Sequence, residues 1–160
     1  MAQEDFRIVF AVDRTPDQVF AAVTDVRGWW SEGVDGRTDA LGAEFTYRHG
    51  DLHRSTQRIT ELIPGARVVW EVVDAEVTFV RDRGEWKGTR VIFDIVPRAE
   101  GAELSFTHAG LVPAAECYAQ CADAWGFYVG ESLRNLITTG KGHPDPKEVA
   151  RRGRPEGSAP

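Results

Sequence analysis

The residue best suited to chemistry is His108. It follows Phe106 in the alternating segment AELSFTH, so strand geometry directs both side chains to the same face. A histidine on an enclosed apolar face can act as a general acid or base, or it can hydrogen-bond a ligand. The other interpretation, and the commoner one for a histidine between apolar residues, is a core side chain that is bonded to a nearby backbone carbonyl. The sequence leaves both open.

Two cysteines form a second candidate group. Cys117 and Cys121 are four residues apart, a spacing that places both thiols on one face of a helix. With a histidine they would supply the ligand types that zinc prefers, but the spacing provides no fourth ligand. Side chains on successive helical turns run parallel and do not readily reach the torsion of a disulfide. We therefore expect two free thiols that fill space as small apolar groups.

Two further histidines flank a turn. His49 and His53 stand on either side of residues 50–51, in the segment HGDLH. A two-residue hairpin would place position 49 opposite 52 rather than 53, so the two imidazoles would not converge on a metal ion. We expect exposed histidines at the edge of a turn.

Motifs of the common enzyme classes are absent from the sequence. The chain has no G-x-S-x-G, H-E-x-x-H, G-x-G-x-x-G or P-loop pattern. Four glutamates fall in predicted strands whose two faces both carry apolar residues, so alternation does not orient their carboxylates. They are Glu44, Glu61, Glu71 and Glu76. We assign no catalytic residue, metal or cofactor, and a cofactor-free enzyme with an unfamiliar site stays open as an alternative.

Composition indicates an ordinary globular protein. The chain has 160 residues, of which 42% are apolar and 28% charged, and its net charge is −6. An acidic balance argues against a nucleic-acid partner. No apolar run approaches the length of a membrane span, and the first residues lack the basic and apolar regions of a signal peptide. These features predict a cytoplasmic protein without a membrane partner.

Strand and helix patterns follow one another along the chain. Residues 6–12 alternate as in a strand, and Thr15, Pro16 and Gln18 form a capping box that begins a helix over 16–24. Strand patterns separated by turn residues then continue to position 108. The predicted strands are EFTYRH, HRSTQRITELI, RVVWEVV, EVTFV, TRVIFDIV and AELSFTH. They predict an antiparallel meander with one apolar face.

A long helix is predicted over 113–139, and Gly140 follows as its C-terminal cap. At 100° per residue, one face carries mainly apolar groups. That face comprises Cys117, Tyr118, Cys121, Trp125, Tyr128, Val129, Ser132 and Leu136. Phe127 falls on the polar side, where it could serve self-association or lie beneath a loop; a single aromatic residue does not make a patch, so we expect the loop.

The order of these elements predicts an α+β fold in which a curved antiparallel sheet wraps around the C-terminal helix. A single domain over 1–142 accommodates all of them. Residues 143–160 are rich in proline and glycine and have little to bury, so we expect a mobile, disordered tail whose removal leaves thermal stability nearly unchanged.

Several segments resemble one known family. They are TPDQVFAAVTDVRGWW at 15–30, EWKGTRVIFDI at 85–95, LSFTHAGLVP at 104–113 and CYAQCADAWGFYVGESLRNLITTGKG at 117–142. The chain resembles the helix-grip superfamily, also called START-like, Bet v 1-like or SRPBCC. Within it the chain is similar to homologues of the activator of the heat shock protein 90 ATPase. This fold hosts carriers, receptors, cyclases and co-chaperone domains, so the resemblance does not fix the chemistry.

The resemblance implies a cavity between the sheet and the long helix. Its expected lining residues are Trp30, Trp70, Phe93, Phe106, His108, Cys121, Trp125 and Tyr128. The leading hypothesis is a protein that binds a small hydrophobic molecule there. A co-chaperone domain with a chaperone as its partner is one alternative, and a cofactor-free cyclase or dehydratase with His108 as acid–base is another.

Overall fold

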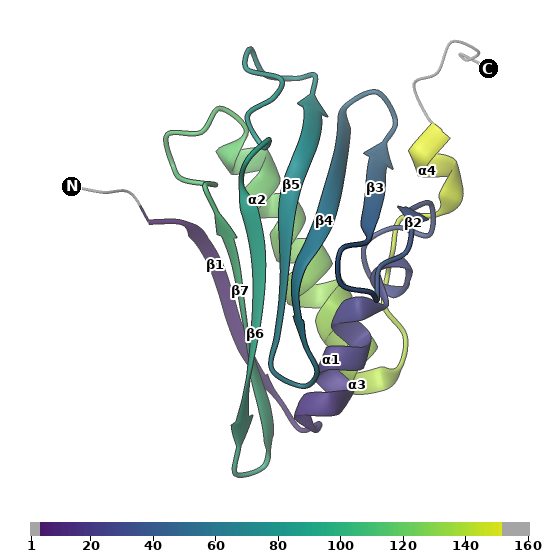
Figure 1. The fold of residues 1–160 in the computed structure, drawn as a ribbon, viewed down its shortest axis with the longest axis vertical. Helices are drawn as coiled ribbons and strands as arrows, with labels where there is room; N and C mark the ends of the chain where they lie inside the picture. Colours follow the sequence, from purple (N-terminus) through teal and green to yellow (C-terminus); the bar gives the residue numbers. More distant parts are fainter. Residues whose placement is uncertain (1–3, 152–160) are drawn as a thin grey trace.

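A seven-stranded antiparallel sheet forms the larger layer of the protein. The computed structural model describes residues 4–151. Across the sheet the strands lie in the order β1-β7-β6-β5-β4-β3-β2, as Figure 1 shows. The strands are β1 (Phe6–Val12), β2 (Asp35–Gly36), β3 (Glu44–His49), β4 (His53–Ile63), β5 (Arg67–Val77), β6 (Arg90–Arg98) and β7 (Gly101–Ala109).

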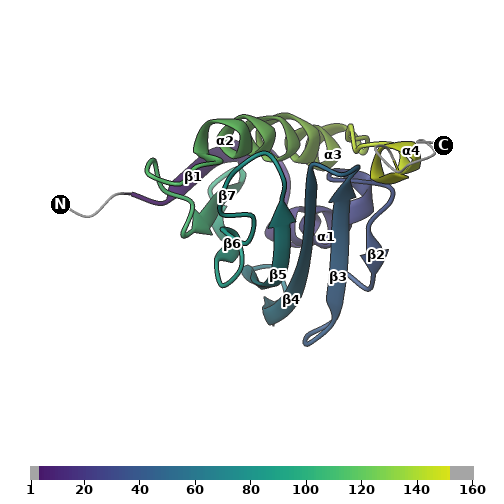
Figure 2. The same ribbon diagram turned by 90° about the horizontal axis from the view of Figure 1, so that it is seen from above.

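The helices lie on the concave side of this sheet. Figure 2 shows the long C-terminal helix as a layer over the strands, so the predicted α+β architecture is confirmed. No helix in the part of the chain that the structure describes is long and apolar enough to cross a membrane. The helical segments are α1 (Pro16–Thr24), η1 (Val26–Gly28), α2 (Tyr118–Phe127), η2 (Tyr128–Leu133), α3 (Arg134–Thr139) and α4 (Lys147–Arg151).

Helix α1 begins as its sequence predicts. The Thr15 side chain accepts a hydrogen bond from the backbone N–H of Gln18, and the Gln18 side chain accepts one from the Thr15 backbone N–H. This reciprocal pair satisfies two N–H groups that an uncapped helix would leave free. Val19 and Val23 on its inner face are fully buried.

The long helix begins later than predicted. Its first helical residue is Tyr118 rather than Pro113, and Cys117 occupies the N-cap position. The Glu85 carboxylate accepts hydrogen bonds from the backbone N–H groups of Glu116 and Cys117. A side chain from the loop before β6 therefore satisfies the donors that an earlier turn of helix would have used.

A π-helical turn interrupts the long helix at η2. Such a turn accommodates one more residue than an α-helical turn, so the buried face shifts by one position beyond it. Leu133 and Ile137 are consequently buried, whereas the predicted core residue Leu136 is only half-buried. A prediction that assumes 3.6 residues per turn throughout the helix cannot place the buried residues correctly beyond η2.

Strand β5 differs from the two strands predicted for its region. It continues without a break to Val77, and residues 78–80 form turns rather than the second half of a strand EVTFV. The backbone N–H of Val77 donates to the carbonyl of Arg83, which turns the chain away from the sheet. The loop that follows inserts Trp86 into the core, where it is 4% exposed.

Residues 143–151 contact the rest of the protein, which differs from the expected mobile tail. Asp145 makes an isolated parallel bridge with Ser31, and the carbonyl of Val149 accepts a hydrogen bond from the Gly50 backbone. Val149 is buried. Composition did not reveal this because backbone hydrogen bonds and one buried valine hold the segment. The remainder of the expected tail, 152–160, lies outside the described residues.

Close packing at Gly142 lets this segment turn back toward the sheet. A Cβ atom there would lie 2.4 Å from the carbonyl oxygen of Gly28 and 2.9 Å from that of Ser132. Both are backbone atoms, so no larger residue fits without displacing the chain. The Ser132 hydroxyl donates to the Trp29 carbonyl and accepts from the His143 backbone N–H.

Phe127 is not covered by a loop. Its side chain is 39% exposed, and its ring meets Tyr128 edge to face at a centroid distance of 5.4 Å. The expectation that a loop would bury it is wrong, because the neighbouring contact comes from its own helix.

Truncation after Gly142 should destabilise the protein. It removes the Asp145 and Val149 contacts described above, which together stabilise the fold by about 2–3 kcal/mol. We expect the thermal midpoint to fall by roughly 5–10 °C in a calorimetric or circular-dichroism scan.

The matched control removes only residues 152–160. If both truncations lower the midpoint equally, the contacts of residues 143–151 do not stabilise the fold.

Candidate functional site

A cavity of about 420 Å³ lies between α2, the strands β3 and β4, and the loops that follow β3 and β5. Leu52 and Phe79 on these loops are 51% and 42% exposed, so they stand at its mouth. Lining residues farther from the mouth, such as Trp30 and Trp125, are buried and belong to the hydrophobic core. The lining consists of Trp30, Tyr47, His49, Leu52, His53, Phe79, Trp86, Gln120, Cys121, Ala124, Trp125 and Tyr128.

Aromatic rings form most of the inner wall. Trp30 stacks on Tyr47 with a centroid distance of 4.2 Å and lies 5.0 Å from the ring of Trp125. Trp86 also stacks on Trp125, with 5.7 Å between centroids. Such a wall suits a flat apolar molecule, because ring faces offer large contact areas.

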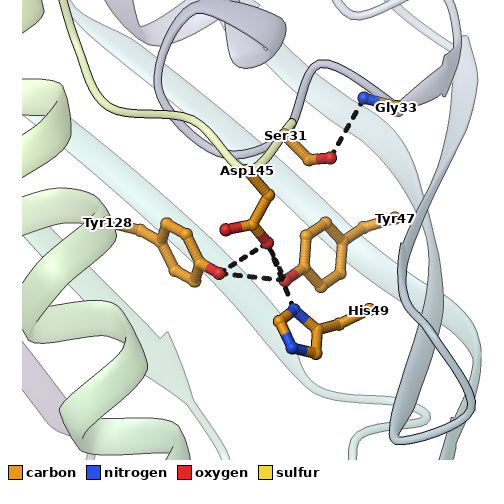
Figure 3. Close-up of polar contacts among 6 residues, drawn as sticks. All are labelled: Ser31, Gly33, Tyr47, His49, Tyr128 and Asp145. Carbon is orange, nitrogen blue, oxygen red and sulfur yellow. Dashed lines mark hydrogen bonds and ion pairs between the residues drawn. The ribbon is translucent and has the colours of Figure 1, made fainter. Parts of the chain in front are cut away.

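The polar end of the cavity is organised by Asp145. Figure 3 shows its carboxylate between two tyrosines and a histidine. One oxygen, Oδ2, accepts from the Tyr128 hydroxyl at 2.7 Å and the Tyr47 hydroxyl at 3.1 Å, and lies 3.2 Å from His49 Nδ1. Burial, reinforced by the neighbouring carboxylate, raises the pKa of both tyrosines, so both phenols stay protonated.

Backbone contacts fix Asp145 in this position. Its N–H donates to the carbonyl of Trp30, and its carbonyl accepts from the N–H of Glu32. The Ser31 side chain accepts from the Gly33 backbone N–H and shapes the adjoining loop (Figure 3). Pro144 and Pro146 on either side favour an extended backbone, which a parallel bridge needs.

His108 lies in the core behind Trp125 rather than in the cavity wall. Its Nδ1 accepts from the Trp125 indole N–H at 3.0 Å, and its Nε2 lies 2.8 Å from the Thr89 hydroxyl. Nδ1 is an acceptor, so Nε2 carries the hydrogen and donates to Thr89, which in turn donates to the Trp86 carbonyl. Burial, with a smaller effect of His53, lowers the pKa of His108 to about 3, so the imidazole is neutral.

His53 faces the cavity, contrary to the expectation of an exposed turn histidine. The hairpin turn is one residue longer than expected, so His49 pairs with His53 across the strands. Its ring meets Trp86 edge to face at 4.3 Å, and its Nε2 lies 3.3 Å from the Ser55 hydroxyl. Burial, and then repulsion from His49 and Arg54, lowers the pKa of His53 to about 3.

The eight residues expected at the site divide into two groups. Trp30, Cys121, Trp125 and Tyr128 line the cavity. The others are fully buried in the aromatic core and do not line it. They are Trp70, Phe93, Phe106 and His108. Ring contacts join the groups, since Phe106 lies 4.8 Å from Trp125.

Several residues of the site were not predicted from the sequence, for different reasons. Tyr47 shares the inward alternation of β3 with Phe45, and that signal could have found it. Trp86 and Phe79 lie in an irregular loop, where no periodicity orients a side chain. Asp145 lies between prolines in a polar segment that composition assigned to a tail.

Both cysteines are free and buried, as their spacing predicted. The Trp86 indole N–H donates to Cys117 Sγ at 3.3 Å. A hydrogen bond with Cys121, together with burial, raises the pKa of the Cys117 thiol. Within residues 4–151, no three His, Cys, Asp or Glu side chains come together in a way that could hold a metal ion.

The strand glutamates belong to the outer surface. Glu44 pairs with Arg58 at 2.6 Å, Glu61 with Arg67 at 3.1 Å and Glu76 with Arg83 at 3.4 Å. None of the four, Glu71 included, lines the cavity. Exposed pairs of this kind add little stability.

The curved sheet, the long helix and the cavity between them define a helix-grip protein. A family model described as Activator of Hsp90 ATPase homolog 1-like protein matches residues 13–138. The chain therefore belongs to this family. No curated protein sequence matches the chain.

Solved structures share the fold. The Aha1 dimer from Colwellia psychrerythraea is 20% identical with a TM-score of 0.69, and the match covers 87% of this chain and 99% of that one. DynU16, a putative protein in the dynemicin biosynthetic locus, is 22% identical with a TM-score of 0.61, over 87% of this chain and 49% of that one. CalU16 from Micromonospora echinospora is 16% identical with a TM-score of 0.59, over 83% and 74%.

The buried histidine should make the protein less stable in mild acid. Between the ordinary pKa of 6.5 and the folded value of about 3, the unfolded chain binds a proton at His108 and the folded protein does not. Stability therefore falls as the pH is lowered through this range. Between pH 7 and pH 5, His108 should reduce the free energy of unfolding by about 2 kcal/mol, measured by urea unfolding.

The variant His108→Asn retains an acceptor for the Trp125 N–H but removes the titrating group. Its loss of stability between pH 7 and pH 5 should be smaller than that of the wild type by about 2 kcal/mol. His143→Asn, at an exposed histidine, is the matched control and should keep the full loss. Equal pH dependence in the wild type and His108→Asn would contradict the assignment.

Proposed function

We propose that this protein binds a small, largely apolar molecule in the cavity between the sheet and α2. The observation that carries the proposal is a cavity of about 420 Å³, walled by tryptophan and tyrosine rings inside an otherwise packed core. Cavities of this size and character are typical of small-molecule sites. The cytoplasmic location expected from the sequence remains part of the proposal.

The mouth of the cavity supports entry of an apolar ligand. Leu52 and Phe79 lie there with large exposed surfaces, on two loops that are tied together. The Thr78 backbone N–H donates to the Leu52 carbonyl, and the Thr78 hydroxyl donates to the Asp51 carbonyl. Binding of a hydrophobic molecule would cover both apolar side chains.

The position of His108 gives no support to a cyclase or dehydratase in which this residue is the acid–base. Both imidazole nitrogens are engaged within the core, and Trp125 lies between the ring and the cavity. A general base must come within hydrogen-bonding reach of its substrate. Ligand binding is therefore better supported by this geometry than a reaction with His108 as its acid–base.

A second candidate follows from the family match over residues 13–138. The family description refers to activation of a chaperone ATPase, so a chaperone is a candidate partner. Adding the purified protein to an Hsp90 and measuring ATP hydrolysis tests this candidate. A rise in the hydrolysis rate would favour it over simple ligand binding.

Filling the cavity should weaken binding of a neutral apolar probe. Ala124 lies on α2, is exposed and lines the cavity, so Ala124→Phe places a ring in the opening without disturbing the core. The fluorescence of N-phenyl-1-naphthylamine should rise on addition of the wild-type protein. We expect Ala124→Phe to weaken its binding by at least about tenfold.

The same substitution at Ala119 is the matched control. Ala119 is exposed on the same helix but does not line the cavity, so Ala119→Phe should bind the probe as the wild type does. Equal loss in both variants, or equal binding in both, would place the probe elsewhere on the protein and count against the proposal.

A further inference from the structure

Three side chains form the polar end of the cavity, and all of them contact one buried acceptor. Tyr47, His49 and Tyr128 line the cavity, whereas Asp145 lies behind them with its side chain 14% exposed. Asp145 Oδ2 is 2.7–3.2 Å from the two phenol oxygens and His49 Nδ1 (Figure 3). The carboxylate therefore determines which atoms remain available to a ligand.

Hydrogen-bond direction follows from the chemistry of these groups. An ionised carboxylate only accepts, so Nδ1 of His49 must carry a hydrogen and the Tyr128 hydroxyl must donate. The Tyr47 oxygen lies 3.1 Å from Oδ2 and 3.2 Å from the Tyr128 oxygen, so its proton also stays within the cluster. What the two phenols can still offer to a ligand is lone pairs.

The charges around the cavity also favour a hydrogen-bond donor over an anion. Among the described residues that line the cavity there is no lysine or arginine, and the chain has a net charge of −6. A bound carboxylate would meet no lysine or arginine, His53 is neutral, and His49 already contacts Asp145. It would also approach Asp145. A protonated amine would instead meet phenol oxygens and a nearby carboxylate.

Two other polar groups border the cavity and do not change this balance. Nε2 of His53 lies next to the Ser55 hydroxyl, away from the Asp145 cluster. Gln120 is exposed on α2, and its amide both donates and accepts. Neither provides a charge that would hold an anion.

We propose that the cavity selects molecules with a flat apolar body and a terminal hydrogen-bond donor, above all a protonated amine, and discriminates against carboxylates. Asp145 is the specificity-determining residue, acting through Tyr47, His49 and Tyr128. This inference rests on the proposed binding function and adds the chemical class of the ligand.

Three probes with the same ring system test the inference on the wild-type protein. They are 2-(2-naphthyl)ethylamine, 2-(2-naphthyl)ethanol and 2-naphthylacetate, and isothermal titration calorimetry at pH 7.5 gives their dissociation constants. We expect the amine to bind at least about tenfold more tightly than the carboxylate, with the alcohol between them. Equal or tighter binding of the carboxylate overturns the inference and leaves the binding function intact. Absence of binding by all three overturns both.

The variant Asp145→Asn tests the residue assigned to this selectivity. It removes the negative charge and introduces an N–H donor at nearly the same size, so the preference for the amine over the carboxylate should fall by about tenfold. Asp123→Asn makes the same charge change at an exposed position on α2 outside the cavity and should keep the wild-type preference. An unchanged preference in Asp145→Asn overturns the role of Asp145. Should that variant fail to fold, the wild-type probe series still decides the ligand class.

Discussion

The indole ring of Trp125 makes the contacts on which both the core and the cavity depend. Its ring packs against Trp30, Trp86 and Phe106, and its N–H is bonded to a buried histidine. One side of the indole thus belongs to the packed interior, while the other forms cavity wall. A large aromatic residue can serve both purposes because its N–H is hydrogen-bonded within the core. Trp125 therefore belongs both to the packed core and to the cavity wall, as Trp30 and Trp86 do.

Patterns with a fixed period predicted the parts of the molecule that are regular. The capping box at Thr15, the antiparallel strands and the apolar face of the C-terminal helix all appear in the structure. Helical spacing also brought Cys121, Trp125 and Tyr128 to one side, and these three line the cavity. Alternation in β7 correctly directed Phe106 and His108 inward. It could not show that Trp125 would cover them.

Irregular segments account for what the sequence did not reveal. The π-helical turn shifts the buried face from Leu136 to Ile137, and no pattern of residue types predicts an inserted residue in a helix. Trp86 lies on a loop and packs into the core. Backbone hydrogen bonds to Trp30 and Glu32 hold Asp145 beside the polar end of the cavity. Each of these depends on contacts between segments distant in sequence, which local preferences do not encode.

The bridge between Ser31 and Asp145 has a consequence for how this family can diversify. The family match ends at residue 138, whereas the carboxylate that orients the polar end of the cavity is at position 145. The aromatic wall and the three side chains at its polar end, Tyr47, His49 and Tyr128, therefore lie within the matched segment, and only the carboxylate that they contact lies beyond it. Under the proposed ligand selectivity, a substitution at position 145 would change ligand preference without altering the tryptophans. Because the backbone of the same segment also stabilises the fold, selectivity and stability are coupled at this position.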